Sequence, residues 1–427
     1  MHPRSAPALA ESARRYLNVR NTSVALAGPL SAEDCAAQSM PDASPVKWHL
    51  AHTTWFFETF VLERMLGSAH RPFHPPFRVL FNSYYNTVGA RHPRPERGLL
   101  TRPGFGDVMS YRHHVDETLA ALLARPERLD PELLALVDLG LHHEQQHQEL
   151  ILTDVKHLLS RNPLQPAYEA NWPLMKIAAR TPAWVRMGGG VHEIGHSRPG
   201  FAFDNEEPRH RVLLRDFAIA AYPVSNGEYL EFMADGGYTR PELWLSLGWD
   251  FVQAHSIRAP LYWTYTDSEW RAFTLHGPVP VDANTPLAHV SYFEADAYAR
   301  WAGARLPTEA EWEVFALNAA DGIEEGNFLE SRMLHPVPPR RPRSAQRAQQ
   351  VFGDIWEWTS SSYAPYPGFV APAGAVGEYN GKFMCNQYVL RGGSCATPRS
   401  HIRASYRNFF PPEARWQFSG LRLARDA

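Results

Sequence analysis

HHEQQHQE, residues 142–149, lies in the middle of Pro131–Ser160, the longest stretch of this sequence with a helical pattern. Proline is accepted in the first turn of a helix, so Pro131 fits the start of this one. Residues four apart lie on the same face of a helix, so His143 and His147 can bind one metal ion together. The stretch therefore predicts a helical domain with a metal site on its longest helix.

Three further segments before residue 165 have a helical period. Glu11–Val19 is a short one. In Pro45–Gly67 apolar residues recur every three or four positions. In Gly106–Leu123 the pattern repeats, and Asp107 is the expected N-cap. Four helices in the first part of the chain favour a four-helix bundle, in which facing helices supply the ligands of a metal site.

A second histidine pair, His49 and His52, lies on the Pro45–Gly67 segment. One of them, together with His143 and His147, would give a three-histidine site with positions left open for substrate and oxygen. The run His143-Glu144-Gln145-Gln146-His147 also fits the H-E-x-x-H pattern of zinc peptidases, in which Glu144 would be the general base. A solvated polar helix face is the third interpretation. Composition does not decide among these alternatives.

A polar loop follows the second helix and contains Tyr84 and Tyr85, flanked by asparagines. Two adjacent phenols in such a loop are candidate proton donors; the alternative is that one packs and the other is half exposed. Arg91 and Arg94 follow, and they could clamp a carboxylate by charge-assisted hydrogen bonds. Their alternative is solvated surface charge.

The chain changes character near residue 165, where proline-rich sequence replaces the helical pattern. We expect residues 1–165 to form the bundle, residues 166–182 a linker, and residues 183–427 a second domain. In that domain short apolar runs are broken by Gly, Pro and Asn. Helices are expected at Ser291–Ala302 and at Thr308–Leu317, where Thr308 and Glu311 form a capping box. Residues 332–350 are expected to form a solvated surface loop.

Composition excludes several classes of protein. The 427 residues carry a net charge of −3, so no basic field indicates nucleic acid or an anionic membrane. Cys35, Cys385 and Cys395 are too few for a disulfide scaffold or a four-cysteine metal site. No apolar run reaches the ~18 residues of a membrane span, and the N-terminus lacks the apolar core of a signal peptide. We therefore expect a cytoplasmic protein.

Several motifs resemble one family. Residues 48–58, WHLAHTTWFFE, and residues 143–149, HEQQHQE, resemble the DinB-type domain of the ergothioneine sulfoxide synthases, the EgtB family. The second half resembles the formylglycine-generating-enzyme fold, a C-type-lectin-like domain with little regular secondary structure. It does so in four motifs: residues 305–313 (RLPTEAEWE), 353–359 (GDIWEWT), 390–394 (LRGGS) and 420–423 (GLRL). The resemblance covers nearly the whole chain and implies an α+β fold.

The resemblance implies Fe(II) held by His52, His143 and His147. It implies an oxygen-dependent reaction that joins the sulfur of cysteine to C2 of the imidazole of hercynine, trimethylated histidine, as a sulfoxide. Gln146 is in the family position that contacts the hercynine imidazole through water. Glu149 is expected to orient an imidazole rather than to bind the metal.

The resemblance also bears on the sulfur donor. Family members that use γ-glutamylcysteine have Trp-Asp after Arg-Asn, and an arginine four residues past the aspartate. Here the run from residue 407 to 414 is RNFFPPEA, so Phe410 and Ala414 stand at the two charged positions. The run resembles the branch that uses free cysteine, in which the catalytic phenols match Tyr84 and Tyr85.

In that branch Arg91 and Arg94 are in place to bind the carboxylate of cysteine. Asn408 is expected to bind substrate, and Phe409 and Phe410 are expected to face the trimethylammonium group of hercynine; plain packing is the alternative for the two rings. Thr397 and Ile402 stand where formylglycine-generating enzymes carry a cysteine pair, so copper chemistry on sulfatases is not expected. Three rival functions remain: a selenoneine synthase that uses a selenosugar, a zinc hydrolase, and a catalytically silent binding module.

Overall fold

The computed structural model describes residues 11–125, 129–170, 182–197, 199–319, 321–339 and 347–427. The chain divides into two compact units, Met1–Leu158 and Leu159–Ala427. The first unit is helical and the second contains sheets, so the mixed α+β class expected from the sequence is confirmed. Most of the proposed linker, residues 171–181, lies outside the described residues.

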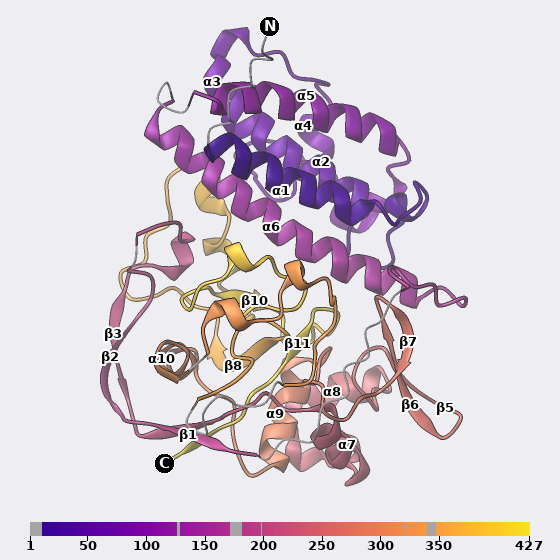
Figure 1. Ribbon diagram of the computed structural model, residues 1–427, viewed down its shortest axis with the longest axis vertical. Helices are drawn as coiled ribbons and strands as arrows, with labels where there is room; N and C mark the ends of the chain where they lie inside the picture. The colour runs from indigo at the N-terminus through magenta and orange to yellow at the C-terminus, as the bar shows by residue number, and fades with distance from the viewer. Residues whose placement is uncertain (1–10, 126–128, 171–181, 198, 320, 340–346) are drawn as a thin grey trace, which may run out of the picture. The chain divides into compact units, whose positions relative to one another are not determined.

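Four long helices form the first unit, and short helical turns connect them (Figure 1). The long ones are α1 (Glu11–Ala27), α2 (Val46–Phe56), α5 (Phe105–Leu123) and α6 (Pro131–Ser160). The short ones are η1 (Asp34–Ala36), the π-helix η2 (Phe57–Leu62), α3 (Glu63–Leu66), η3 (Gly67–Ala69), α4 (Phe77–Leu80) and η4 (Arg94–Leu99). Every residue of α2 is buried, so α2 is the central helix of the unit.

Two helix boundaries differ from those expected. Helix α1 continues to Ala27 instead of ending at Val19, because its second half is held by buried contacts of Arg20 and Ser23 that outweigh its weak local propensity. Helix α5 begins at Phe105, and its N-cap is Gly104 instead of Asp107. The Asp107 carboxylate reaches back to accept the N–H of Gly104 at 2.9 Å, so it stabilises the helix from the third position.

In its described residues the second unit combines short strands with four α-helices and several 3-10 turns. The helices are α7 (Asn226–Ala234), α8 (Ser246–Ala254), α9 (Tyr292–Trp301) and α10 (Glu309–Ala319). The strands are β1 (Trp184–Met187), β2 (Gly190–Ile194), β3 (His210–Leu214), β4 (Phe217–Ala220), β5 (Trp263–Thr266), β6 (Glu269–Thr274), β7 (Gly277–Pro280), β8 (Trp356–Ser362), β9 (Tyr388–Arg391), β10 (Asn408–Phe410), β11 (Ser419–Gly420) and β12 (Ala424–Asp426). Helices α9 and α10 agree with the two expected there.

The strands of the second unit form small sheets in the orders β1-β4-β12, β10-β9-β8-β11, β2-β3 and β5-β6-β7. Strand β11 runs parallel to β8, and the other named strand pairs are antiparallel. The β2–β3 pair forms a long curved ribbon (Figure 1). The small sheets and connecting turns agree with the expectation of little regular secondary structure.

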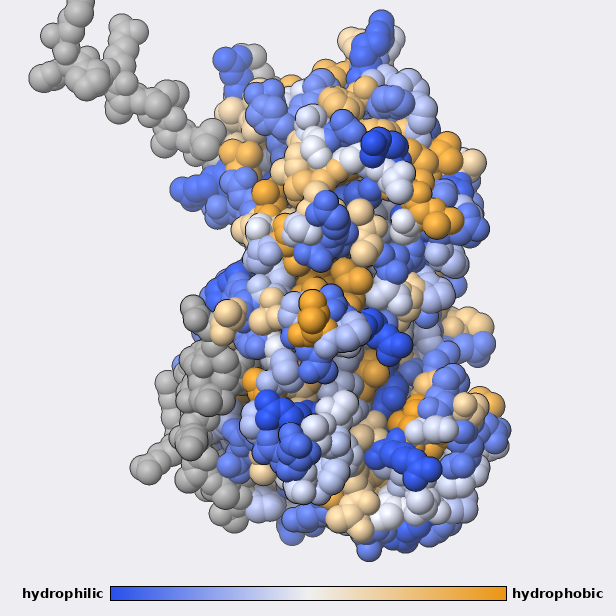
Figure 2. Space-filling model, turned by 90° about the vertical axis from the view of Figure 1, so that its right-hand side faces the viewer, coloured by the Kyte–Doolittle hydropathy of each residue, from blue (hydrophilic) through white to orange (hydrophobic). Residues whose placement is uncertain are grey.

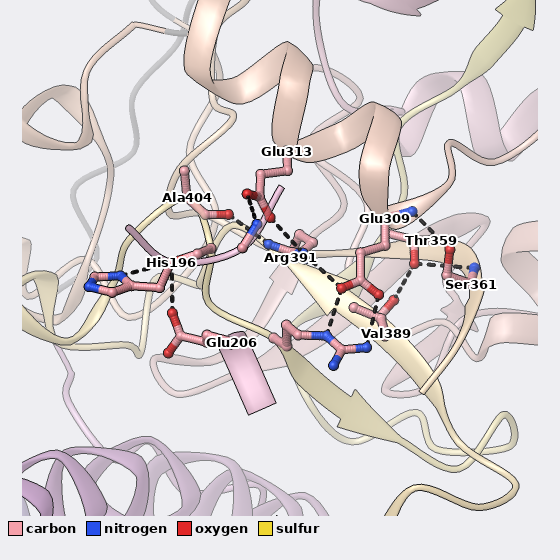
Figure 3. A network of polar contacts seen from close by, with 12 residues as sticks. His196, Glu206, Glu309, Glu313, Thr359, Ser361, Val389, Arg391 and Ala404 are labelled. Carbon is pink, nitrogen blue, oxygen red and sulfur yellow. Dashed lines mark hydrogen bonds and ion pairs between the residues drawn. The ribbon is translucent and has the colours of Figure 1, made fainter. Parts of the chain in front are cut away.

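A buried ion network explains the charged residues of the second unit's motifs (Figure 3). Arg391, on β9, donates to Glu309 at 2.9 Å and to Glu313 at 3.0 Å, and both glutamates lie on α10. Thr397 likewise has a structural contact, since its Oγ1 accepts the N–H of Ser394 at 2.8 Å. These residues hold helix, sheet and turn together in the core of this unit.

The segment 332–350 is not the solvated loop that its composition predicts. Residues 340–346 lie outside the described part of the chain, but Leu334 and Ala348 are fully buried. Gln350 donates to the carbonyl of Val337 at 2.8 Å and to Asp354 at 3.0 Å. Both described ends of the segment are therefore packed, because Asp354 anchors them to the strand region that follows.

Hydrophobic and hydrophilic side chains are interspersed over the face of the molecule in Figure 2. Among the described residues of the first unit, the exposed large hydrophobic residues are Phe73, Val79 and Leu99. In the part of the chain that the structure describes, no helix is long and apolar enough to cross a membrane.

Candidate metal centre

Three imidazoles from two helices converge in the first unit. His52 comes from α2, and His143 and His147 come from successive turns of α6. The Nε2 atom of His143 lies 3.2 Å from Nε2 of His52 and 3.1 Å from Nε2 of His147. One nitrogen from each ring lies within 4.8 Å of the others, so the three could hold one metal ion. No carboxylate belongs to this group among the described residues.

His52 is oriented from both faces and from its far edge. Its Nδ1 donates to the carbonyl oxygen of Phe81 at 2.6 Å. A carbonyl only accepts, so the proton is on Nδ1 and the lone pair is on Nε2. The ring is stacked between Trp48, at 4.6 Å between ring centres, and Trp55, at 5.6 Å. The fold therefore fixes both the tautomer and the plane of this ring.

A hydrogen-bonded chain lies behind His147. Nδ1 of His147 lies 2.8 Å from Nδ1 of His49, and Nε2 of His49 lies 3.0 Å from the Asp154 carboxylate. His49 and Asp154 are 2% and 5% exposed, respectively. His49, the other candidate for the third ligand, therefore contacts the outer edge of His147 instead of facing the Nε2 atoms of the three rings.

Burial keeps the three imidazoles neutral. It lowers the pKa of His143 to about 3, despite the neighbouring Glu144 charge, which acts in the opposite direction. It also lowers the pKa of His52 and of His147 well below the ordinary value, and the neighbouring His143 lowers both further. A neutral imidazole has a nitrogen lone pair, and that is the form that binds a metal.

Glu144 does not belong to the metal centre, although it is next to His143 in sequence. Its Oε2 accepts from Arg20 at 2.8 Å, its Oε1 accepts from Ser23 at 2.6 Å, and Arg112 forms a second ion pair with Oε1. Desolvation alone would raise the pKa of this carboxyl, but the two arginines and the Ser23 hydroxyl lower it to about 2. An anion held by three donors is a poor general base, so the general-base role that the zinc-hydrolase interpretation gives to Glu144 does not fit these contacts.

The two candidate phenols lie together instead of on opposite sides of the chain. The rings of Tyr84 and Tyr85 are 4.8 Å apart and tilted by 30°. The backbone bends here, so the alternation expected of an extended segment does not apply. Tyr85 is buried and packs against Trp55, which stacks on His52, whereas Tyr84 is half-buried. Of the two phenols, Tyr85 is thus connected by ring contacts to a candidate metal ligand.

Arg97 is a buried cation that packs on Trp48, a neighbour of His52, and the sequence did not single it out. Its guanidinium carbon lies 3.3 Å from the centre of the Trp48 ring, and its Nη1 donates to Ser44 at 2.8 Å. Burial lowers its pKa, and the charges of Arg94 and Arg91 lower it further. Among the described residues Arg97 forms no ion pair, and its buried Nε has no hydrogen-bond partner. Arg97 could therefore accept an incoming carboxylate as its counter-charge.

Arg91 and Arg94, the two predicted clamps, are exposed. Arg91 donates to the carbonyl of Ser83 at 3.2 Å, and Arg94 donates to the carbonyl of Asp42. The repeat of arginine at positions 91, 94 and 97 was the signal that could have pointed to Arg97. Arg97 differs from Arg91 and Arg94 in being buried, and no sequence pattern indicates that burial.

The remaining predicted residues are distributed over both units. Gln146 and Glu149 lie on α6, Gln146 partly exposed and Glu149 buried. Asn408, Phe409 and Phe410 form β10 of the second unit, where Phe409 stacks on Tyr363 at 4.0 Å. That packing agrees with the alternative role considered for Phe409. The roles of these residues toward a substrate stay predictions.

Comparisons with known proteins match both halves of the chain. Residues 15–151 match the DinB superfamily, and residues 173–427 match the sulfatase-modifying factor enzyme 1-like domain. Hercynine oxygenase of Mycobacterium tuberculosis is 36% identical over 92% of this chain and 94% of its own length. Hercynine oxygenase of Mycolicibacterium thermoresistibile is 33% identical over 98% of this chain and 96% of its own length.

A partial match extends the similarity to fungi. Ergothioneine biosynthesis protein 1 of Schizosaccharomyces pombe is 30% identical over 53% of this chain and 28% of its own length. The pairing of a DinB region with a sulfatase-modifying-factor region, across nearly the full length of two relatives, is a more specific feature than either region alone.

Proposed function

The chain belongs to the EgtB family of ergothioneine sulfoxide synthases, which are oxygen-using enzymes, and from that premise we propose that it joins cysteine to hercynine with Fe(II) as its metal. In this reaction the C2–H bond of the hercynine imidazole and the S–H bond of cysteine break, and a C–S bond forms. One atom of O2 becomes the sulfoxide oxygen and the other leaves as water. The product is hercynylcysteine sulfoxide.

The observation that carries the proposal is the group of three neutral imidazoles. His52, His143 and His147 would hold the metal through Nε2, and this donor set fits Fe(II) because nitrogen ligands suit iron and three of them leave positions open. Since no carboxylate of the described residues belongs to the group and all three rings are neutral, these ligands would leave a bound Fe(II) ion with its full positive charge. When bound, Fe(II) would supply the oxidising chemistry with O2; the protein's own residues would bind and orient the two organic substrates.

Arg97 is the residue best placed to bind the carboxylate of cysteine. It is 5% exposed and has no ion-pair partner among the described residues, so a carboxylate would meet a desolvated positive charge. Arg91 and Arg94, which are exposed and whose charges act on Arg97, would add to the positive potential around it. Tyr85 is the proposed phenol donor, since a buried O–H can deliver a proton to an oxygen that develops charge.

For hercynine we propose Gln146 as a contact in the first unit; Asn408, Phe409 and Phe410 stay substrate-binding candidates that the family resemblance alone implies. Gln146 is next to His147 on α6 and is partly exposed, so a substrate or a bridging water can reach its amide. Phe409 and Phe410 offer aromatic faces to a trimethylammonium group, the kind of cation that such rings bind. These contacts, like the use of cysteine, are inferred from the family resemblance and from the residue chemistry.

The test is an anaerobic assay of the Fe(II)-loaded protein with hercynine and one donor at a time, started by oxygen. The donors are cysteine, γ-glutamylcysteine and a selenosugar. We expect a sulfoxide product, one O2 consumed per product, and cysteine as the best donor. A selenosugar as the best donor would make the protein a selenoneine synthase. No product with any donor, together with no iron bound, would support a silent binding module.

Donor preference is the first testable prediction. Phe410 and Ala414 cannot form the ion pairs that would hold a glutamyl arm, and each such charge-assisted hydrogen bond contributes about 1.5–3 kcal/mol. In direct competition, cysteine should exceed γ-glutamylcysteine in kcat/KM by roughly 10-fold or more. The double substitution Phe410→Asp/Ala414→Arg should lower the ratio of kcat/KM for cysteine to kcat/KM for γ-glutamylcysteine. A parent protein that prefers γ-glutamylcysteine would contradict the prediction.

Removal of the Tyr85 hydroxyl should change the product. Without a nearby O–H donor, the thiol of cysteine is expected to take up both oxygen atoms of O2, which gives cysteine sulfinate in place of coupling. We expect Tyr85→Phe to shift the product ratio toward sulfinate, with iron content unchanged, because the ring and its packing on Trp55 remain. Product analysis by mass spectrometry measures the ratio.

Tyr84→Phe is the matched control for Tyr85→Phe, because it removes a hydroxyl from the adjacent ring. We expect a smaller shift from it, since Tyr84 is only half-buried. If Tyr84→Phe, Tyr85→Phe and the double substitution all keep the product ratio and the rate of the parent, neither phenol is the donor.

A further inference from the structure

The hydrogen-bonded chain behind His147 assigns a role to His49, which the sequence offered only as a candidate ligand, and to Asp154, which the sequence did not single out. We propose that His49 and Asp154 are positioning residues that hold His147 in the tautomer whose Nε2 can bind a metal. The proposal rests on the proposed metal site and goes beyond it, because it concerns the protein's own proton arrangement. His49 lies on α2, and Asp154 lies on α6, seven residues after His147.

The hydrogen bonds behind His147 continue without a break from His147 through His49 to Asp154. Nδ1 of His147 is 2.8 Å from Nδ1 of His49, and Nε2 of His49 is 3.0 Å from Oδ2 of Asp154. The same Oδ2 accepts the backbone N–H of Ser44 at 2.8 Å. His49, Asp154 and Ser44 are all less than a tenth exposed, so water does not compete freely for these contacts.

The direction of each hydrogen bond follows from the acceptor at the end of the chain. A carboxylate only accepts, so Nε2 of His49 carries the proton that faces Asp154. In a neutral ring the other nitrogen then has the lone pair, so Nδ1 of His49 accepts. Its neighbour, Nδ1 of His147, must therefore donate, and this leaves the lone pair of His147 on Nε2, which faces His143.

The opposite direction would disable the site. If Nδ1 of His49 donated to His147, the proton of His147 would be on Nε2, among the three converging nitrogens, and that atom could not bind a metal. Nε2 of His49 would then turn a lone pair toward the Asp154 carboxylate. Asp154 thus selects the metal-binding tautomer across two rings, in the way that the carbonyl of Phe81 selects it for His52.

This hydrogen-bonded chain of side chains also reaches Arg97, the residue proposed to bind the carboxylate of cysteine. Arg97 donates to the hydroxyl of Ser44, whose backbone N–H is bonded to Asp154. The positive Arg97 and the negative Asp154 are therefore joined through one residue, and both are buried. Ser44 thereby connects the residue proposed to bind the carboxylate of cysteine to the hydrogen-bonded chain behind His147.

The first experiment measures Fe(II) affinity of the full-length protein by anaerobic competition with a chelator. We expect His49→Leu to weaken Fe(II) binding by about 10-fold to 100-fold, the range typical when the partner of a ligating histidine is removed. His49→Gln should recover most of the affinity, because its amide oxygen can accept from His147 while its amide nitrogen donates to Asp154. If His49 only filled space, His49→Gln would restore Fe(II) affinity no better than His49→Leu does.

Ser39→Ala is the matched control. It removes the partner of another histidine on α6, since Ser39 lies 2.7 Å from Nδ1 of His157, but it does not touch the three converging rings. We expect its Fe(II) affinity to equal that of the parent. If His49→Leu binds Fe(II) with the affinity of the parent, His49 and Asp154 do not position His147, and the proposal is overturned. A parent that binds no Fe(II) would instead overturn the proposed metal site.

A second measurement needs no folded variant of His49. In metal-free protein labelled with ¹⁵N-histidine, long-range ¹H–¹⁵N correlations report which ring nitrogen carries the proton, and His147 is assigned by its loss in His147→Gln. We expect the proton of His147 on Nδ1 and that of His49 on Nε2. A proton on Nε2 of His147 would overturn the proposal, whatever the affinities show.

Discussion

Alanine in place of His143 is expected to abolish both iron binding and sulfoxide formation while the helical bundle stays folded. Nε2 of His143 lies between the corresponding atoms of His52 and His147, so its loss removes the central donor of the group. The two remaining imidazoles, those of His52 and His147, would not hold Fe(II) at the concentrations of an assay. Iron content, turnover started by oxygen and far-ultraviolet circular dichroism of His143→Ala measure the three parts of this expectation.

His157→Ala is the control, because His157 lies on the same helix and contacts Ser39 instead of the metal centre. It should keep its iron and its activity. His52→Ala and His147→Ala should behave like His143→Ala. If His52→Ala keeps full iron content and activity, His52 is not the third ligand, and His49 becomes the next candidate.

Glutamine in place of Glu144 is expected to lower the free energy of unfolding by about 3–5 kcal/mol, the range found when one partner of a buried ion pair is removed. Glu144 is fully buried, and its carboxylate is the shared counter-ion of Arg20 and Arg112. Without it, two desolvated guanidinium groups face each other with less negative charge between them. Urea unfolding at neutral pH measures the change, and metal content at low temperature should be retained.

The control for Glu144→Gln is Glu117→Gln on α5, where the carboxylate is 69% exposed and pairs with an exposed histidine. Its effect should stay within about 0.5 kcal/mol. Arg112→Met added to Glu144→Gln should restore part of the lost stability, since it removes one unpaired cation. A Glu144→Gln protein of parental stability that has lost catalysis would instead favour a general-base role for this residue.

The difference between parent and Glu144→Gln should also depend on pH. The pKa of the Glu144 carboxyl is lowered from 4.5 to about 2 in the folded protein. A group whose pKa is lowered by folding stabilises the native state above its unfolded pKa, and that contribution is lost as the pH falls through the folded value. The two unfolding free energies should therefore approach each other as the pH falls from 4.5 toward 2.

Local pattern was sufficient for much of this protein. The helical period of residues 131–160 and the four-residue spacing of His143 and His147 depend only on the geometry of one helix, so both could be predicted from the sequence. The helices α9 and α10 could be predicted for the same reason, since a capping box is local. The motifs of residues 305–313 and 390–394 indicated the fold of the second half, and the structure shows why: they supply the Arg391, Glu309 and Glu313 network.

The tertiary structure decided which of several similar residues does which task. His49 and His52 share one helix, and only the rotation of α2 against α6 turns His52 toward His143 and His49 toward the outer edge of His147. Glu144 looks like a zinc-site base until α1 and α5 bring Arg20 and Arg112 to it. Arg97 differs from Arg91 and Arg94 only by burial. The physical reason is common to all three: periodicity determines which residues share a face, whereas the partner of that face comes from chain segments tens of residues away, whose packing no local pattern encodes.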